Sequence, residues 1–282
     1  MVKKILLAGA ATALISGAAS AADLPRRAAP PVFVPVPVFT WTGAYFGINA
    51  GYAFSDNRDI RTSGLNNLGA PGGANLQLNV DRGLRRGSVP LEQDGFTGGG
   101  QIGYNYQFTP GSGIVVGLEA DAQYTDLQRR RVETIFNPVF NPNVLTNVYQ
   151  HDVNFIGTVR GRLGYAFDRV LVYGTGGFAY GDVTQTVTFQ TGAPITYAGS
   201  RANIQTGYAY GGGIEYALPT DSFLNFFKSS AVTIKAEYLR YDLGDRSVLV
   251  GSTGGPGIGY VSTFSTEGSL ARAGLNYKFG SY

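Results

Sequence analysis

The 282-residue sequence contains no cysteine, which excludes disulfide bonds and thiolate metal sites. Histidine is almost absent too, because His151 is the only one in the chain. A structural metal needs more ligands than one imidazole and scattered carboxylates. No serine lies near His151 at a spacing typical of a nucleophile and its base. We therefore expect no enzyme activity, no metal site and no resident cofactor.

Excess charge of one sign is also missing. The formal net charge is +3, and setting aside Lys3 and Lys4 at the start of the chain leaves +1. A nearly neutral chain offers no electrostatic footprint for nucleic acid. Apolar residues make up 44% of the chain, yet beyond its first part no apolar stretch is long enough for a membrane helix.

The first residues have the pattern of a secretory leader. Basic residues are followed by an apolar stretch over residues 5–15 and by the small residues Ala19 and Ala21 around Ser20. The apolar stretch is too short for a membrane anchor. We predict a signal peptide over residues 1–21, with cleavage after Ala21 or, as the next choice, after Ala22.

Residues 22–40 are rich in proline and alanine, a composition that favours an extended chain without internal hydrogen bonds. We expect a periplasmic linker here, and a docking peptide for a periplasmic partner is the alternative. Residues 41–282 form the remaining domain.

Strict alternation of large apolar residues with small or polar ones recurs through this domain. It is the period of a β-strand whose two faces meet different surroundings. The apolar face carries many Tyr and Phe residues near the strand ends, as in strands that face lipid. We predict strands over residues 43–54, 96–108, 114–124, 153–167, 170–180, 208–216, 232–241 and 270–279. The seventh carries a bulge near Leu239, Arg240 and Tyr241, and the facing of the fifth stays open because it is rich in glycine.

The connections alternate in length. Residues 55–94, 125–152 and 181–203 form long loops, whereas residues 109–113 and 168–169 form short turns. An exception is residues 218–230, where an amphipathic segment is expected at the inner lipid interface, and residues 183–189 have a composition that could extend a strand. Long outer loops and short periplasmic turns are typical of outer-membrane barrels and not of a soluble β-sandwich. The predicted fold is all-β, an eight-stranded antiparallel up-and-down transmembrane β-barrel in the cell outer membrane.

The polar face of the strands carries charges of both signs. A barrel of eight strands encloses a space that side chains fill, so charges inside must pair. We predict a luminal salt-bridge network. A catalytic acid–base pair formed by Glu119 and Asp121 is the weaker alternative. The members of the network are Glu119, Asp121, Arg160, Arg162, Glu215, Lys235, Glu237, Arg272 and Lys278.

Arginines cluster at two places that the strand order brings to one outer rim. Arg is well suited to bidentate contacts with phosphate, and the outer leaflet is rich in phosphate. We expect a lipopolysaccharide-binding patch, with ordinary solvated loop charge as the alternative. The patch comprises Arg82, Arg85, Arg86, Arg129, Arg130 and Arg131.

Short motifs at both ends of the domain add a family resemblance. They are Trp41-Thr42-Gly43-x-Tyr45-x-Gly47, Lys235-Ala236-Glu237-Tyr238-Leu239, Tyr241-Asp242-Leu243-Gly244 and Arg272-x-Gly274-Leu275-Asn276-Tyr277-x-Phe279. With the leader, they resemble the small outer-membrane β-barrel proteins of alphaproteobacteria, the RopB-like surface antigens within the OmpA-like membrane-domain superfamily. The resemblance covers essentially the whole mature chain and implies an abundant surface protein with structural or host-facing roles. Some members are labelled porins, and some are reported to bind haem.

Outer-membrane proteins generally end in an aromatic residue that the barrel-assembly machinery recognises. Here Phe279 keeps the alternation of the last strand, although Gly280, Ser281 and Tyr282 follow it. We therefore assign the assembly signal to Phe279, and Tyr282, which is out of register with the strand, is the alternative.

These observations favour a non-enzymatic outer-membrane barrel with an envelope-structural and surface-exposed role, in contact with membrane lipids and lipopolysaccharide. A small diffusion channel is one alternative. A haem receptor that uses Tyr149, Tyr197 or His151 as an iron ligand is another, since haem needs only one axial ligand. The sequence leaves the oligomeric state open.

Overall fold

The computed structural model describes residues 38–56, 59–68, 74–192, 195–219, 222, 232–254 and 258–279. The expected leader, most of the expected linker, most of residues 218–230 and the three residues after Phe279 lie outside this part. Within it, no helix is long and apolar enough to cross a membrane. The elements are β1 (Gly43–Ser55), β2 (Asp59–Gly64), α2 (Gln77–Asp81), β3 (Ser88–Pro90), β4 (Asp94–Gln107), β5 (Ser112–Asn137), β6 (Asn141–Phe167), β7 (Val170–Thr191), β8 (Ile195–Ala217), β9 (Val232–Ser252) and β10 (Tyr260–Lys278).

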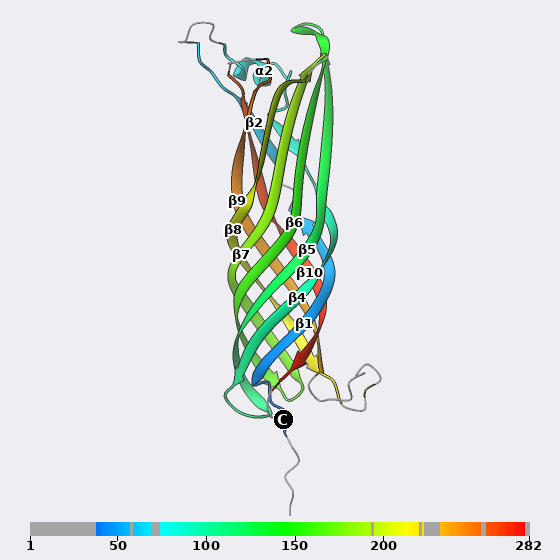
Figure 1. Cartoon of the computed structure of the whole chain (residues 1–282), viewed down its shortest axis with the longest axis vertical. Helices are drawn as coiled ribbons and strands as arrows, with labels where there is room; N and C mark the ends of the chain where they lie inside the picture. Colours follow the sequence, from blue (N-terminus) through cyan, green and yellow to red (C-terminus); the bar gives the residue numbers. More distant parts are fainter. Residues whose placement is uncertain are drawn as a thin grey trace, which may run out of the picture. The chain divides into compact units, whose positions relative to one another are not determined.

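The strands close into a ring. β1, β4, β5, β6, β7, β8, β9 and β10 pair in this order, and β10 pairs with β1 to complete the circuit (Figure 1). Every pairing is antiparallel. Closure leaves no unpaired edge at this level of the barrel. The predicted all-β antiparallel barrel is therefore confirmed, and β2 and β3 are additions outside the eight-membered ring.

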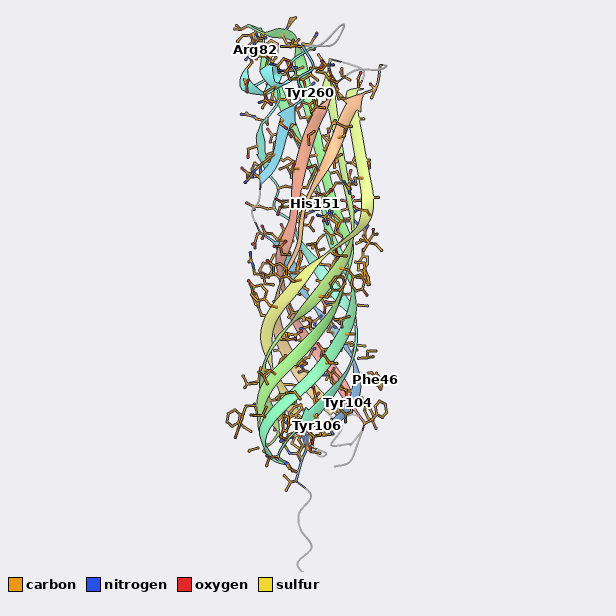
Figure 2. The ribbon with its side chains drawn as sticks, turned by 90° about the vertical axis from the view of Figure 1, so that its left-hand side faces the viewer. Phe46, Arg82, Tyr104, Tyr106, His151 and Tyr260 are labelled. Carbon is orange, nitrogen blue, oxygen red and sulfur yellow. The ribbon has the colours of Figure 1, made fainter. Side chains whose placement is uncertain are left out.

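Side chains alternate between the two faces of this ring. Along β4, Ile102 and Tyr104 are exposed on the outside, whereas Gln101 and Asn105 are buried inside. Figure 2 shows aromatic side chains on the outer face near the short turns, where Phe46, Tyr104 and Tyr106 are labelled. A second group on the outer face lies further along the strands. It consists of Tyr52, Phe54, Phe96, Tyr124, Phe178, Tyr208, Tyr210 and Tyr238. An apolar outer band between aromatic belts is the arrangement that a lipid bilayer requires.

Beyond the second aromatic group the barrel continues as a projecting sheet. The expected loops over residues 125–152 and 181–203 are largely strand, because β5, β6, β7 and β8 run on through them. The first long loop also contains structure, namely β2, α2 and β3. The loops expected over residues 125–152 and 181–203 were therefore wrong as loops, whereas the expected extension of a strand through residues 183–189 is present in β7. The alternating pattern there has no aromatic, lipid-facing side that would distinguish it from a polar loop. At this level β10 pairs with β2 rather than with β1, and β3 pairs with the other side of β2.

The barrel interior is built of layers that can be followed along β6. From the short-turn end, Ala166 belongs to a basal apolar layer, and Arg162 and Arg160 follow it. Ile156 and Val153 then belong to a middle apolar layer. Beyond these comes Tyr149, which lies in a distal apolar layer inside the projecting sheet. The interior is therefore filled rather than open.

The middle apolar layer explains a feature of the sequence. Leu239 and Tyr241 lie on the inner face of β9, after the inward Lys235 and Glu237. The alternation persists, but the inner face changes from polar to apolar. The bulge predicted at residues 239–241 lies further along β9. The register between β9 and β10 shifts just after Asp242, and Gly244 has a φ of 78°.

Candidate functional site

Eight of the nine charged residues predicted to face the lumen meet in one buried cluster, which we call the luminal network. Arg160 is at its centre because its guanidinium reaches carboxylates on two other strands. Its Nη2 lies 2.7 Å from Glu119 Oε1 and 2.8 Å from Asp121 Oδ2, and its Nη1 lies 3.1 Å from Glu237 Oε1. Arg272 Nη2 lies 3.0 Å from Asp121 Oδ2 and 2.5 Å from Glu237 Oε2. All five of these side chains are fully buried.

The other members extend the network toward the short-turn end. Lys235 Nζ lies 2.8 Å from Glu119 Oε1, and Arg162 Nη2 lies 2.8 Å from Glu215 Oε2. Neutral side chains saturate the remaining oxygens: the Tyr45 hydroxyl donates to Glu119 Oε2 at 2.7 Å, and the Tyr173 hydroxyl donates to Glu237 Oε1 at 3.0 Å. The network thus holds four acids (Glu119, Asp121, Glu215, Glu237) and four bases (Arg160, Arg162, Lys235, Arg272). Equal numbers of acids and bases are expected here, because an unpaired charge in a region of low dielectric is costly.

The ninth predicted member, Lys278, lies at the short-turn mouth of the barrel. Its Nζ donates to the carbonyl of Thr42 at 2.9 Å and lies 5.6 Å from the centre of the Phe39 ring. Phe39 packs edge-on against Trp41, with 5.2 Å between ring centres. Trp41 is buried, and its indole N–H donates to the carbonyl of Asp168 at 3.0 Å. The segment before β1 therefore fills the mouth of the barrel.

Three kinds of barrier thus follow one another along the lumen. The basal apolar layer contains Phe39 and Trp41, the luminal network lies above it, and the middle apolar layer is closed by side chains such as Leu127 and Leu243. The described side chains therefore fill the lumen at three successive levels, two of them apolar and one made of paired charges.

His151 lies within residues 125–152, which were expected to form a long loop, and for this residue the expectation was wrong. It lies on the inner face of β6, 4% exposed, between the middle and distal apolar layers (Figure 2). Its Nε2 is 3.3 Å from the hydroxyl of Thr266, and its ring centre is 5.5 Å from that of Phe264. Burial lowers the pKa of His151 from 6.5 to about 4. The ring is therefore neutral at physiological pH.

The depressed pKa predicts that the projecting sheet loses stability in acid. A histidine whose folded-state pKa lies below its unfolded value contributes full stability above pH 6.5 and loses it as the pH falls toward 4. The total loss should be about 3 kcal/mol. Hydrogen exchange of peptides covering residues 145–153, corrected for intrinsic rates, should accelerate between pH 7 and pH 4.5. Asp56 also lines the small cavity beside the His151 ring. Because Asp56 is present in the wild type and in the variant alike, a difference between the two reports on His151.

The variant His151→Gln keeps a polar group beside Thr266 without a titrating ring. Its exchange should be nearly independent of pH over the same range. Peptides covering residues 114–122 at membrane level serve as the internal control. Equal acceleration in the wild type and the variant would contradict the assignment to His151.

The tyrosines considered as iron ligands lie in the projecting sheet as well. Tyr149 is fully buried in the distal apolar layer and packs against Phe189, and burial raises its pKa. Tyr197 is partly buried, with its ring 5.1 Å from that of Tyr260. Tyr149 and His151 therefore cannot present a ligand atom at the surface, and the described residues contain no group of three or more His, Asp or Glu able to hold a metal ion.

Arg85 does not belong to an exposed patch, so this part of the predicted lipopolysaccharide site was wrong. It is 3% exposed and inserts from the segment after α2 into the distal end of the sheet. Its Nη1 donates to Asn147 Oδ1 at 2.5 Å, and its Nη2 donates to Thr191 Oγ1 at 3.0 Å. The guanidinium lies 5.0 Å from the centre of the Phe189 ring. Its role is to fasten the segment to β6 and β7.

The other five predicted arginines are exposed but do not form one surface. Arg82 lies over the Phe140 ring at 5.0 Å, near the tip of the β5–β6 hairpin. Arg129 and Arg131 pair with the inward-facing His151 and Tyr149, so they share the inner face of the sheet. Arg130 lies on the outer face. Arg131 also forms an ion pair with Glu133 at 2.7 Å.

Phe279, the predicted assembly signal, lies on the outer face at the short-turn end. It is exposed and stacks on Phe46, with 5.5 Å between ring centres. Its backbone N–H donates to the carbonyl of Ala44 at 2.7 Å. The last aromatic is thus paired to the first strand, at the seam where β10 meets β1.

Sequence reasoning did not assign the groups that close the mouth and seal the middle of the barrel. Trp41 and Gln107 are the main examples, since the Gln107 side chain accepts the backbone N–H of Trp41 at 2.7 Å. The apolar residues Leu239 and Tyr241 are the others. For Leu239 and Tyr241 the sequence did carry a signal, because both occupy inward positions of the alternating pattern at which a polar residue was expected.

Comparison with known proteins agrees with this geometry. The family model described as outer membrane protein beta-barrel domain matches residues 9–279. The 31 kDa outer-membrane immunogenic proteins of Brucella melitensis biotype 1 and Brucella suis biovar 1 are each 32% identical over 278 residues, which cover 98% of this chain and 100% of theirs.

Similar solved structures include the outer membrane protein OprG from Pseudomonas aeruginosa. It is 15% identical, with a TM-score of 0.41, over 87% of this chain and 100% of OprG. The attachment invasion locus protein Ail of Yersinia pestis is also 15% identical, with a TM-score of 0.29, over 84% of this chain and 99% of Ail.

The match to the family model and to the Brucella relatives, together with the lipid-facing barrel, places the chain in the cell outer membrane. The chain belongs to the outer-membrane β-barrel protein family and is a relative of the Brucella outer-membrane immunogenic proteins.

Proposed function

We propose that the protein is a non-conducting, non-enzymatic barrel that anchors a rigid extracellular sheet in the outer membrane. The observation that carries the proposal is the filled lumen, in which a balanced charge network lies between two apolar layers. A diffusion channel needs a continuous polar path, and two apolar layers across the lumen argue against one. Neither is a surface haem site favoured, because two of its three candidate ligands are buried.

The length of the strands supports the second half of the proposal. β5 and β6 contain 26 and 27 residues. A tilted strand needs only about 9–11 residues to cross a membrane. The excess lies outside the lipid and is stabilised by its own core, the distal apolar layer. Such a sheet is a structured surface rather than a set of loose loops, which suits a protein of the envelope surface.

Single-channel recording on the mature chain tests the proposal. After refolding into a planar bilayer, with heat-modifiable gel mobility as proof of folding, the protein should give no discrete conductance steps. A large porin in the same bilayer provides the positive control. Reproducible steps from the folded protein would contradict the sealed lumen and would make the diffusion channel its main function.

The partner proposed for the exposed arginines is lipopolysaccharide. Arg130 lies on the outer face of β5, and Arg129 and Arg131 lie on its inner face. Arg82 and Arg86 lie in the segment around α2, and all five side chains are exposed. Guanidinium groups form charge-assisted, bidentate contacts with phosphate. Because these groups are exposed, each contact is weak and screened by salt, and the effect depends on their number.

Replacing the five exposed arginines with glutamine should weaken binding of purified lipopolysaccharide to the refolded protein about tenfold. The salt dependence of binding should also become shallower. Arg201→Gln, which removes one exposed arginine from β8, is the control and should bind nearly as the wild type. Unchanged affinity and salt dependence in the fivefold variant would contradict this partner.

A further inference from the structure

The projecting sheet has a long edge at β5 that no other described strand covers, and the ladder between β8 and β9 is also interrupted between Ala198 and Tyr208. At membrane level β5 pairs with β4, but that ladder ends at Thr125, opposite Thr97. Beyond this point β5 pairs with β6 on one side, and no other described strand pairs with residues 128–136. The opposite edge of the sheet is β3, which is three residues long and ends at Pro90. A proline on a short edge strand blocks pairing, so β5 is the edge that remains available.

This edge presents unpaired backbone groups together with a graded set of side chains. Arg129, Arg130 and Arg131 lie at its membrane-proximal end and are all exposed. Toward the tip of the hairpin, Val132 is 45% exposed and Phe136 is 62% exposed. The edge therefore changes from basic to more apolar over residues 129–136, with Glu133 in between and paired with Arg131 at 2.7 Å. Free N–H and C=O groups on an edge strand are a template for an added strand.

We propose that the free edge of β5 binds an extended, acidic segment of a partner polypeptide by β-strand addition. The proposal rests on the proposed function only in requiring that the sheet is exposed at the surface. An antiparallel segment would place apolar residues opposite Val132 and Phe136 and carboxylates opposite the three arginines. Directly opposed side chains lie about 4.5–5.5 Å apart at Cβ, close enough for ion pairs.

Charge decides against the simplest alternative occupant, a second copy of this chain. Two copies of the edge that pair around Arg130 would bring Arg129 of each against Arg131 of the other. Like charges directly opposite destabilise a strand pair, and charged edge residues are a common defence against self-association. An acidic partner turns the same arginines into attractive contacts.

The test uses the mature protein in phospholipid nanodiscs without lipopolysaccharide. The probe is a fluorescein-labelled peptide of sequence Val-Thr-Val-Thr-Val-Glu-Glu-Glu-Thr, which matches the edge in antiparallel register. Fluorescence anisotropy should show saturable binding. Replacing Arg129, Arg130 and Arg131 with glutamine should weaken that binding about tenfold. Arg86→Gln with Arg201→Gln, which removes two exposed arginines outside β5, should change it less than twofold.

Two N-methylated peptides separate strand addition from plain charge attraction. Each carries methyl groups on alternate residues, in opposite registers, so that only one of them loses the N–H groups that face β5. One should therefore bind as the parent peptide does and the other should not bind. Equal binding of both, or loss of binding by both, would overturn the proposal, as would dimerisation of the protein in place of peptide binding. These results are independent of bilayer conductance, so failure here leaves the sealed-barrel proposal standing.

Discussion

Arg160→Met is expected to destabilise the barrel by about 3–5 kcal/mol, because it removes one charge from a buried, balanced network. Arg160 contacts Glu119, Asp121 and Glu237, and all four side chains are fully buried. Its loss leaves four acids facing three bases in the lumen. Methionine keeps the unbranched stem but ends near the position of Nε, so the effect combines the lost charge and hydrogen bonds with a small cavity where the guanidinium was.

The measurement is urea unfolding of the refolded protein in lipid vesicles. Trp41 is the only tryptophan and is buried in the basal apolar layer, so its fluorescence reports on the folded barrel. The double variant Arg160→Met with Asp121→Asn restores equal charge and should recover a substantial part of the lost stability. Arg201→Met, at an exposed site on β8, is the control. A single variant as stable as the wild type would mean that water already reaches the network.

The membership of this network could be predicted from the sequence, but its connections could not. The alternation of strand residues places Glu119, Arg160 and Glu237 on the inner face without any knowledge of the fold. Which acid meets which base depends on the tilt and stagger of the strands, and these follow from closure of the ring. The same closure places Lys278 at the barrel mouth, where Thr42 and Phe39 surround it.

The projecting sheet was predicted less well for a different physical reason. The strand pattern at membrane level is strong because lipid demands an apolar outer face, and beyond the lipid this demand ends. The three consecutive arginines of β5 therefore interrupt the alternation without interrupting the strand. Arg85 shows the limit most plainly. Nothing in the sequence distinguishes it from Arg82 and Arg86, yet it alone of the three is buried, because only the fold brings Asn147 and Phe189 around it.

Two adjacent glycines in β4 lead to predictions of opposite sign. Gly99 faces the lumen, where a Cβ atom would lie 2.1 Å from the carbonyl oxygen of Ala122 in the neighbouring strand. Gly100 faces lipid, and the nearest atom to its Cβ would be the carbonyl oxygen of Gly47 at 3.6 Å. Gly99→Ala should therefore cost about 3 kcal/mol or prevent assembly, because a backbone atom must move. Gly100→Ala should stabilise the barrel by about 0.4–1 kcal/mol through a less flexible unfolded chain.

The two variants have identical composition and differ only in the face that carries the methyl group. Urea unfolding followed by Trp41 fluorescence, together with the fraction that shows heat-modifiable mobility, measures the difference directly. Gly177→Ala and Gly176→Ala repeat the comparison on β7, where the nearest contacts to Cβ would be 2.2 Å and 3.8 Å. Equal stability within either pair would show that the inner wall has room to relax. A large difference in both pairs would show that inward-facing glycines set how closely the strands of this narrow barrel approach.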